Sequence, residues 1–572
     1  MRSSRRVTAP PEWTCAPATM WRIFTSFYSI MLFTGVVARE KLNVLYIMAD
    51  DLRPALGCYS STLGVKSPNI DQLASRSSVF YNAFAQQALC GPSRTSILTS
   101  RRPDTIRLYD NSHGYWRVQA GNFTTLPQLL KRSGYISRSV GKVFHPGLVS
   151  NHSDDFPLSW SAPPYHPPSL KFERMKVCKG KDGRLHSNLL CAVNVSETPL
   201  GTLPDMENTD EAVRQLRALS RAAEPFFLAV GYYKPHIPFR IPQEFLSLYP
   251  VENMTLAPDP SVPGDLPSVA YNPWTDIRER EDVQALNISF PYGPILKDFQ
   301  LQIRQHYLAA VSYLDAQVGK LLAALEEFGL AEDTIVVFTS DHGWSLGEHG
   351  EWAKYSNFDV ATQVPLLVHV PGRRSPAAPG RRKFRYVDVF KEPHRHFQEG
   401  HGVLQIVELI DVFPTVVQLA GLPAPPLCPY PSSHVELCTE GKSHALTILH
   451  PRVMQQSSVG VAFSQYPRPS DTPQLDSDQP RQPHVRMMGY SVRSADYRYS
   501  LWVGFDPGTC RANMSDVHAG ELYQLSEDPG QDHNLYRRRG PWPLQRKGDN
   551  AEWTRVLQSH LDYVPHQFIH AA

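Results

Sequence analysis

Strand-like and helix-like segments alternate along this chain from Lys41 to about residue 425. Short apolar runs at 41–51, 225–232 and 334–343 are typical of buried strands, and a pattern with one apolar helical face covers 298–329. Alternation of this kind predicts an α/β fold with a large, mostly parallel central sheet flanked by helices. In such folds, ligands bind beyond the carboxyl ends of the strands.

The pattern changes toward the C-terminus. Residues 446–485 include a polar, Pro-rich stretch and predict a loop or linker. Beyond it, segments of 486–572 alternate like β-strands, which predicts a smaller C-terminal α+β subdomain. The large domain that precedes the linker is expected to span 39–445.

The N-terminus carries an apolar run at 20–38 that ends in a Val-x-Ala site, and we assign 1–38 to a secretory signal peptide. Met20 is an alternative start because residues 1–19 are polar. A membrane anchor is the other interpretation of the run, but it is short and interrupted by Ser and Thr, so we expect no stable anchor. Sequons for N-glycosylation also indicate the secretory route, at Asn122, Asn151, Asn194, Asn253, Asn287 and Asn513.

Composition narrows the partners and the compartment. A net charge of +2 gives no indication of nucleic-acid binding. Two cysteine pairs lie close in sequence in polar stretches and are expected to form local disulfides in an oxidising compartment, namely Cys178 with Cys191 and Cys428 with Cys438. Cys15 would leave with the signal peptide, and three cysteines remain, Cys58, Cys90 and Cys510. A bond between Cys58 and Cys510 is one way to use two of them.

Acidic residues follow two of the predicted strands. Asp50 and Asp51 end the first strand, and Asp341 with His342 ends the strand that begins at residue 334. Taken alone, such pairs are more often turns or caps than metal sites, and a lone Cys90 is more often a small buried apolar residue. Because the carboxyl ends of parallel strands share one edge of a sheet, the fold can bring these residues together across about 290 positions.

Two longer motifs give this arrangement a chemical meaning. The stretch "CGPSR" at 90–94 resembles the sulfatase signature Cys-x-Pro-Ser-Arg, and "GYISRSVGKVFH" at 134–145 resembles the second signature of that family. The resemblance covers most of 41–438 and resumes over 464–536. It implies the alkaline-phosphatase-like sulfatase fold, with 39–445 as the catalytic domain.

The resemblance implies a modified nucleophile. Cys90 would be converted in the endoplasmic reticulum to Cα-formylglycine by the formylglycine-generating enzyme, and the hydrated aldehyde would attack sulfur. Pro92 suits the first turn of a helix, where its missing N–H costs nothing. The helix start and the charge of Arg94 would favour an anion there.

The same resemblance implies one Ca²⁺ per chain. Its ligands would be Asp50, Asp51, Asp341, His342 and the modified Cys90. Three carboxylates form a hard, oxygen-rich site that suits Ca²⁺, whereas His342 is unusual because many sulfatases carry Asn at this position.

Other polar residues match the family's catalytic set. Lys142 and His145 are expected to support the formylglycine, and Lys354 to bind a sulfate oxygen. His236 is expected to protonate the leaving sugar oxygen, because histidine can be protonated at lysosomal pH.

Three further positions carry weaker expectations. Trp344 and Tyr355 would border the sugar, with simple packing as the alternative. Ser100 stands where the family pattern has glycine, which predicts a small strain if that position needs a positive φ.

Additional motifs, among them "YKPHIPFR" and "SQYPRPSD", are similar to those of sulfatases that remove the 2-O-sulfate of terminal iduronate in heparan sulfate and dermatan sulfate. This similarity implies a lysosomal exo-sulfatase acting on a sulfated glycosaminoglycan oligosaccharide. The alternatives are a sulfatase with another sugar specificity, a phosphatase or phosphodiesterase of the same superfamily, and an inactive glycan-binding protein. Those phosphatases usually combine Ser or Thr with two zinc ions, whereas this sequence has Cys90 and shows no second ligand set.

Overall fold

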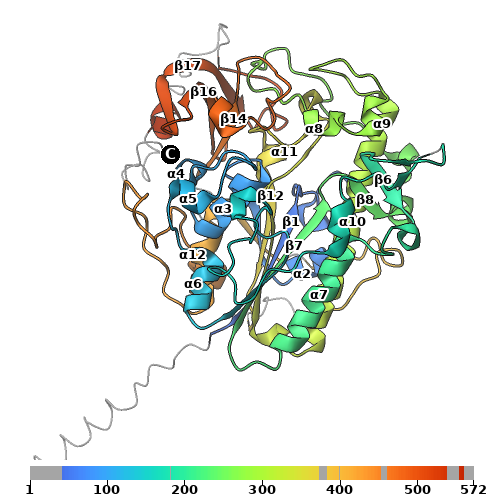
Figure 1. Cartoon of the computed structure of the whole chain (residues 1–572), viewed down its shortest axis with the longest axis vertical. Helices are drawn as coiled ribbons and strands as arrows, with labels where there is room; N and C mark the ends of the chain where they lie inside the picture. Colours follow the sequence, from blue (N-terminus) through green and yellow to red (C-terminus); the bar gives the residue numbers. More distant parts are fainter. Residues whose placement is uncertain are drawn as a thin grey trace, which may run out of the picture. The chain divides into compact units, whose positions relative to one another are not determined.

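The computed structural model describes residues 41–180, 182–372, 383–398, 400–451, 460–536 and 553–558. The predicted signal peptide at 1–38 lies outside these residues. A seven-stranded sheet runs through the centre of the described chain, with helices on both of its faces (Figure 1). A separate four-stranded sheet follows toward the C-terminus.

The central sheet confirms the α/β prediction. Strand β12 is antiparallel to both of its neighbours, whereas every other pairing in this sheet is parallel. The strands lie in the order β13 (His401–Glu408), β2 (Ser78–Phe84), β12 (Gln363–His369), β9 (Thr334–Ser340), β1 (Asn43–Asp50), β7 (Phe226–Pro235) and β3 (Ile136–Gly141).

Strand β1 shows why this sheet needs helices on both faces. Its residues are apolar at successive positions, so side chains of both orientations are buried. Leu45, Ile47 and Ala49 pack into the core on the side of α2 (Pro68–Ala74), α7 (Pro204–Leu219) and α10 (Lys297–Glu327). Val44, Tyr46 and Met48 pack into the core on the side of α3 (Cys90–Thr99), α6 (Leu126–Arg132) and α12 (Val412–Leu419).

Helix α10 is the longest helix of the described chain. It is the one helix there that is long and apolar enough to cross a membrane, but 89 % of its most apolar window is buried inside the protein. Its apolar residues instead pack against α7 and β7.

Short elements connect the main layers. The small helices are α4 (Pro103–Ile106), α5 (Trp116–Ala120), α8 (Thr275–Arg278), α9 (Glu281–Gln284), α11 (Asp359–Thr362) and α13 (Ala445–Leu449). Two-stranded sheets pair β4 (Cys178–Lys179) with β5 (Leu185–His186), β6 (Leu190–Val193) with β8 (Phe239–Pro242), and β10 (Ser345–Leu346) with β11 (Trp352–Ala353).

The C-terminal subdomain is built on an antiparallel sheet. Its strands are β14 (Ala462–Arg468), β15 (Met487–Arg493), β16 (Tyr497–Asp506) and β17 (Arg511–Gln524), and helical residues 553–558 pack on it through Leu557. The sequence predicts a loop over 446–485, but β14 lies within that range. Pro467 makes this strand difficult to recognise in the sequence, because proline usually argues against a strand. It is tolerated here because β14 lies at the edge of its sheet.

Candidate active site

The acidic residues that follow β1 and β9 meet at one edge of the central sheet. The two strands are parallel neighbours, with Ala49 paired with Ser340, so their carboxyl ends coincide. The backbone N–H of Asp51 donates to Oδ1 of Asp341 at 3.3 Å, across 290 residues of sequence. Asp51 adopts a left-handed φ of 67°, and its carbonyl accepts a hydrogen bond from the Tyr307 hydroxyl at 2.8 Å. The strand ends therefore assemble the predicted acidic cluster.

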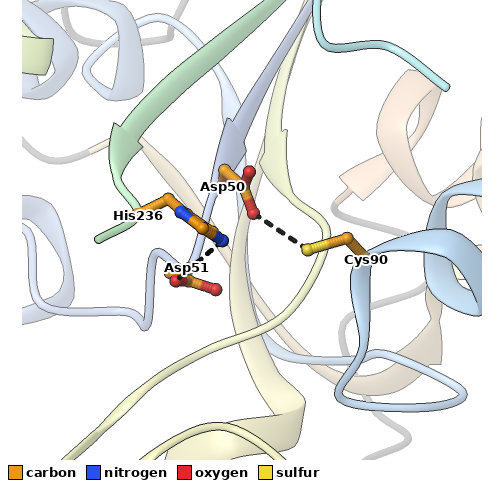
Figure 2. Close-up of side chains that lie close together, drawn as sticks. All are labelled: Asp50, Asp51, Cys90 and His236. Atoms are coloured by element: carbon orange, nitrogen blue, oxygen red, sulfur yellow. Dashed lines mark hydrogen bonds and ion pairs between the residues drawn. The ribbon is translucent and has the colours of Figure 1, made fainter. Parts of the chain in front are cut away.

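Cys90 lies at the start of α3 and points into this cluster (Figure 2). Its Sγ is 3.4 Å from Oδ1 of Asp50 and 3.4 Å from Nε2 of His342. The Nζ atoms of Lys142 and Lys354 lie 3.5 and 3.4 Å from the same sulfur. The structure thus places both predicted catalytic lysines around the predicted nucleophile position.

The charges around Cys90 change the ionisation of its thiol. Burial and the Asp50 carboxylate favour the neutral thiol, but Lys142 and Lys354 outweigh them, and the net pKa of Cys90 is lowered. The pKa of Asp50 is held well below its usual range, because Lys142 and Arg94 more than offset its burial. Position 90 is therefore a site of concentrated positive potential that favours a negative charge.

Arg94 is completely buried and crosslinks the strand ends. Its Nε donates to Oδ2 of Asp341 at 2.7 Å, and its Nη atoms donate to the carbonyls of Lys142 and Ala49. One Nη also lies 3.7 Å from Oδ1 of Asp50. Its guanidinium is thus engaged by the protein itself and holds the acidic residues in place.

The acidic cluster fits a cation. Ligand atoms of Asp50, Cys90, Asp341 and His342 lie within 4.8 Å of one another. Oδ2 of Asp51 is buried and accepts no hydrogen bond within the described part of the chain. Burial is the main cause that raises the pKa of Asp51 to about 7, with the Asp50 charge adding to it and Lys354 opposing it. A metal ion at this point would relieve the repulsion between the carboxylates.

Two histidines border the same cluster. Nε2 of His236 lies 4.0 Å from Oδ2 of Asp51, and its Nδ1 lies 2.5 Å from the Ile237 carbonyl, so Nδ1 carries a hydrogen (Figure 2). Burial and the charge of Lys354 hold the pKa of His236 well below its usual range. Burial also lowers the pKa of His145 to about 3. In the free site both histidines therefore favour the neutral form, and the role of His236 as a proton donor stays a prediction.

The two aromatic residues expected at the sugar are both buried. Trp344 stacks on Tyr307 with ring centroids 5.7 Å apart and meets the edge of Phe239 at 5.6 Å. The hydroxyl of Tyr355 donates to Oδ2 of Asp276 at 2.7 Å. Packing therefore accounts for most of the contacts of Trp344, although its Nε1 is buried with no acceptor among the described residues.

Sequence reasoning missed Asn272, which positions Lys354. Its side-chain amide donates to the backbone carbonyls of Trp352, at 2.8 Å, and Lys354. Its backbone N–H donates to the buried carboxylate of Glu351 at 2.8 Å. The motif "VAYNPW" contains this residue, and an asparagine between an aromatic residue and a proline was the available signal.

The cysteine and sequon predictions have mixed outcomes. The structure contains the Cys178–Cys191 and Cys428–Cys438 disulfides. The suggested Cys58–Cys510 bond is wrong: both are free thiols, with Cys58 beside Asp71 and Cys510 beside Gln482. All six sequon asparagines are exposed, which keeps them available to glycosylation.

Comparisons with known proteins agree with this site. The profile of the family described as Sulfatase matches residues 42–422. The chain is 58 % identical to Iduronate 2-sulfatase of Mus musculus over 91 % of its own length and 97 % of the relative. It is 60 % identical to Iduronate 2-sulfatase of Homo sapiens over 87 % of its own length and 91 % of the relative.

The fold is also similar to that of solved structures. A phosphonate monoester hydrolase of Agrobacterium radiobacter superposes with a TM-score of 0.62 over 91 % of this chain and 95 % of its own, at 19 % identity. At that identity the likeness concerns the fold alone. The family profile and the close relatives go further, and the chain belongs to the sulfatase family of sulfuric ester hydrolases.

Proposed function

We propose that this enzyme hydrolyses the 2-O-sulfate of terminal iduronate 2-sulfate in heparan sulfate and dermatan sulfate. The observation that carries the proposal is the position of Cys90. Its Sγ lies 3.4 to 3.5 Å from side-chain atoms of four polar residues, Lys142, Lys354, Asp50 and His342. The sugar preference is supported by the relatives named Iduronate 2-sulfatase, which match nearly the whole chain.

The proposal includes two groups that the chain would acquire. Asp50, Asp51, Asp341 and His342 would hold one Ca²⁺, which would supply positive charge beside the sulfate oxygens. Cys90 would be converted to formylglycine by the formylglycine-generating enzyme, and its hydrated carbonyl would supply the nucleophile for attack on sulfur. The position fits an anionic nucleophile, because Lys142 and Lys354 already lower the pKa of the thiol there.

The protein's own side chains have distinct tasks in this proposal. Lys354 and Lys142 hold negative charge that develops on the nucleophile and the sulfate oxygens. Arg94 holds the acidic residues in place through its hydrogen bond to the carboxylate of Asp341. His145 remains neutral near Lys142, and its buried Nδ1 has no partner among the residues that the structure describes.

His236 is the proposed proton donor to the leaving sugar oxygen. Its side chain is 21 % exposed, so it borders the open side of the site. Because its pKa is depressed in the free site, the anionic substrate must raise that pKa on binding before His236 can donate. Trp344 and Tyr355 are proposed to shape the wall of the sugar site from a buried position, and the indole N–H of Trp344 has no acceptor among the described residues.

The proposal also assigns a compartment. The expected signal peptide, the six exposed sequons and the disulfides are consistent with the secretory pathway. The similarity to Iduronate 2-sulfatase of Homo sapiens supports a lysosomal destination. The substrate would be a glycosaminoglycan oligosaccharide, and no stable membrane anchor is proposed.

Two measurements test the function. Mass spectrometry of the peptide containing Cys90 should show formylglycine in active enzyme. Sulfate release at about pH 5 should be much faster from a terminal 2-sulfo-iduronate substrate than from glucosamine-sulfate or galactose-sulfate substrates. Unmodified Cys90 in a fully active pool would contradict the nucleophile, and an equal or greater rate on another sugar would contradict the substrate.

A further inference from the structure

His349 connects three distant segments at the edge of the catalytic domain. It lies in the turn Glu348–Gly350, between β10 and β11, and adopts a left-handed φ of 57°. Its side chain is 1 % exposed and stacks on Phe358 with ring centroids 3.9 Å apart. Its backbone N–H donates to the carbonyl of Asp259 at 2.8 Å. The strand that follows this turn leads directly into Lys354.

The ring of His349 also reaches the C-terminal subdomain. Its Nε2 is 2.8 Å from the carbonyl oxygen of Gly530, 3.2 Å from Oδ2 of Asp259 and 3.7 Å from Oδ1 of Asp532. Gly530 and Asp532 follow β17, the last strand of the C-terminal sheet. One imidazole therefore joins residue 259, the turn before Lys354 and the segment after β17.

The hydrogen-bond pattern fixes the form of this imidazole. A carbonyl oxygen only accepts hydrogen bonds, so the contact with Gly530 requires a hydrogen on Nε2. Nδ1 is buried with no partner among the described residues, so a second hydrogen there would be unsatisfied. Burial accordingly lowers the pKa of His349. The lowered pKa favours the neutral form of His349, and the hydrogen on Nε2 leaves that atom no lone pair for a metal ion.

The carboxylates of Asp259 and Asp532 face each other beside this ring. The ligand atoms of His349, Asp259 and Asp532 lie within 4.8 Å of one another. The Asp259 side chain is 10 % exposed, that of Asp532 is 31 % exposed, and Oδ1 of Asp259 is buried with no donor in the described part of the chain. Two ionised carboxylates at this separation repel each other, and one shared proton removes the repulsion and provides a hydrogen bond.

No nearby cation among the described residues forms an ion pair with both carboxylates, so the surrounding charges do not remove the repulsion between Asp259 and Asp532. Glu348 adds negative charge, and the nearby Arg53 and Arg304 lie 2.7 and 4.0 Å from the Glu348 carboxylate. Arg498 faces His349 but forms its ion pair with Glu521 at 2.7 Å. Burial, Asp532 and Glu348 together raise the pKa of Asp259 to about 8.

We propose that Asp259 and Asp532 share one proton and, together with His349, form an acid-stabilised clasp that holds the C-terminal subdomain to the turn leading into Lys354. In the unfolded chain both carboxyls ionise near their ordinary pKa, about 3.9. Between that value and the raised value of the clasp, folding takes up a proton, so stability falls as the pH rises through this range. The clasp is complete in an acidic compartment and loses its proton at mildly alkaline pH.

The test compares Asp259→Asn, Asp532→Asn and the matched control Glu527→Gln, an exposed carboxyl of the same C-terminal segment. An amide can donate to the remaining carboxylate without a shared proton, so both Asn variants should lose much of the decrease in Tm between about pH 5 and pH 8. The wild type and Glu527→Gln should keep the full decrease. The half-life of activity at about pH 8, divided by that at about pH 5, should be larger in the two Asn variants than in the wild type and in Glu527→Gln.

Two results would overturn the clasp. One is the same dependence of Tm on pH in the wild type and in every variant. The other is a rise in the Tm of the wild type with added Zn²⁺ that Asp532→Asn abolishes, because that would make the cluster a metal site. If Asp259→Asn does not fold, Asp532→Asn decides the question, since its side chain is the more exposed of the two.

Discussion

The ammonium of Lys354 donates to Oδ1 of Asp51 at 2.8 Å, across 303 residues of sequence. The same nitrogen lies 3.4 Å from Sγ of Cys90, so one charge serves both the acidic cluster and the nucleophile position. We expect Lys354→Ala to lower kcat by about 10²–10³-fold, the effect typical of losing one group that stabilises transition-state charge. Steady-state sulfate release measures the loss. Lys320→Ala, at an exposed position of α10, is the control and should keep full activity.

Asn272 positions the same lysine through a hydrogen bond to its backbone carbonyl. Asn272→Ala removes two donors to backbone carbonyls and should lower the free energy of unfolding by about 1–3 kcal/mol. Because Lys354 would then be less well positioned, kcat should fall more than KM rises. Denaturant unfolding and kinetics check the two effects separately. A variant with normal kcat and reduced stability would show that Asn272 has no influence on Lys354.

Ser100 ends α3 in a left-handed conformation with φ 51°, as the glycine of the family pattern would. Its hydroxyl donates to the Ile410 carbonyl at 2.7 Å and accepts from the N–H of Gly441 at 3.2 Å. Ser100→Gly relieves the backbone but loses these bonds, so its stability should change by no more than about 1 kcal/mol. Ser100→Ala keeps the strain and loses the bonds, and should be less stable than Ser100→Gly in thermal unfolding. The opposite order would show that the left-handed backbone at position 100 carries no strain that glycine relieves.

Calcium affinity should depend on pH because of Asp51. In the metal-free site the pKa of Asp51 is raised, mainly by burial, to about 7, and a metal binds the ionised form. Below that pH, binding must release a proton, so the affinity should fall about tenfold for each pH unit. Calorimetric titration of Ca²⁺ at several pH values between about 5 and 8 measures this slope. An affinity that stays constant over this range would contradict the assignment of Asp51 as a ligand.

Local patterns in the sequence predicted the elements that carry the site. The strands that end at Asp50 and Ser340 each contain an unbroken apolar run and lead into acidic residues, so both their burial and their shared edge could be inferred. The pattern failed where local and tertiary signals conflict. The apolar spacing of residues 407–422 by itself favours one helix, but Val407 and Glu408 complete β13, because pairing with β2 takes precedence over helical spacing there.

Residues whose role depends on distant partners could not be predicted in the same way. Asn272 and His349 form hydrogen bonds to backbone carbonyls. Every residue has a backbone carbonyl, so the sequence gives no indication of which one is the partner. Arg94 was expected to favour an anion at the start of the helix, but its contacts with Asp341 and two carbonyls became apparent only from the packing of α3.

The burial of Cys90 has a consequence for the order of events during biosynthesis. The side chain is 2 % exposed, and the helix that it starts is tied at its other end, where the Ser100 carbonyl accepts from the N–H of Glu440 at 2.9 Å. Glu440 lies just after the Cys428–Cys438 disulfide, hundreds of residues later in synthesis. If position 90 is converted, the converting enzyme must reach it before the segment around Glu440 packs against α3, because folding then buries the side chain.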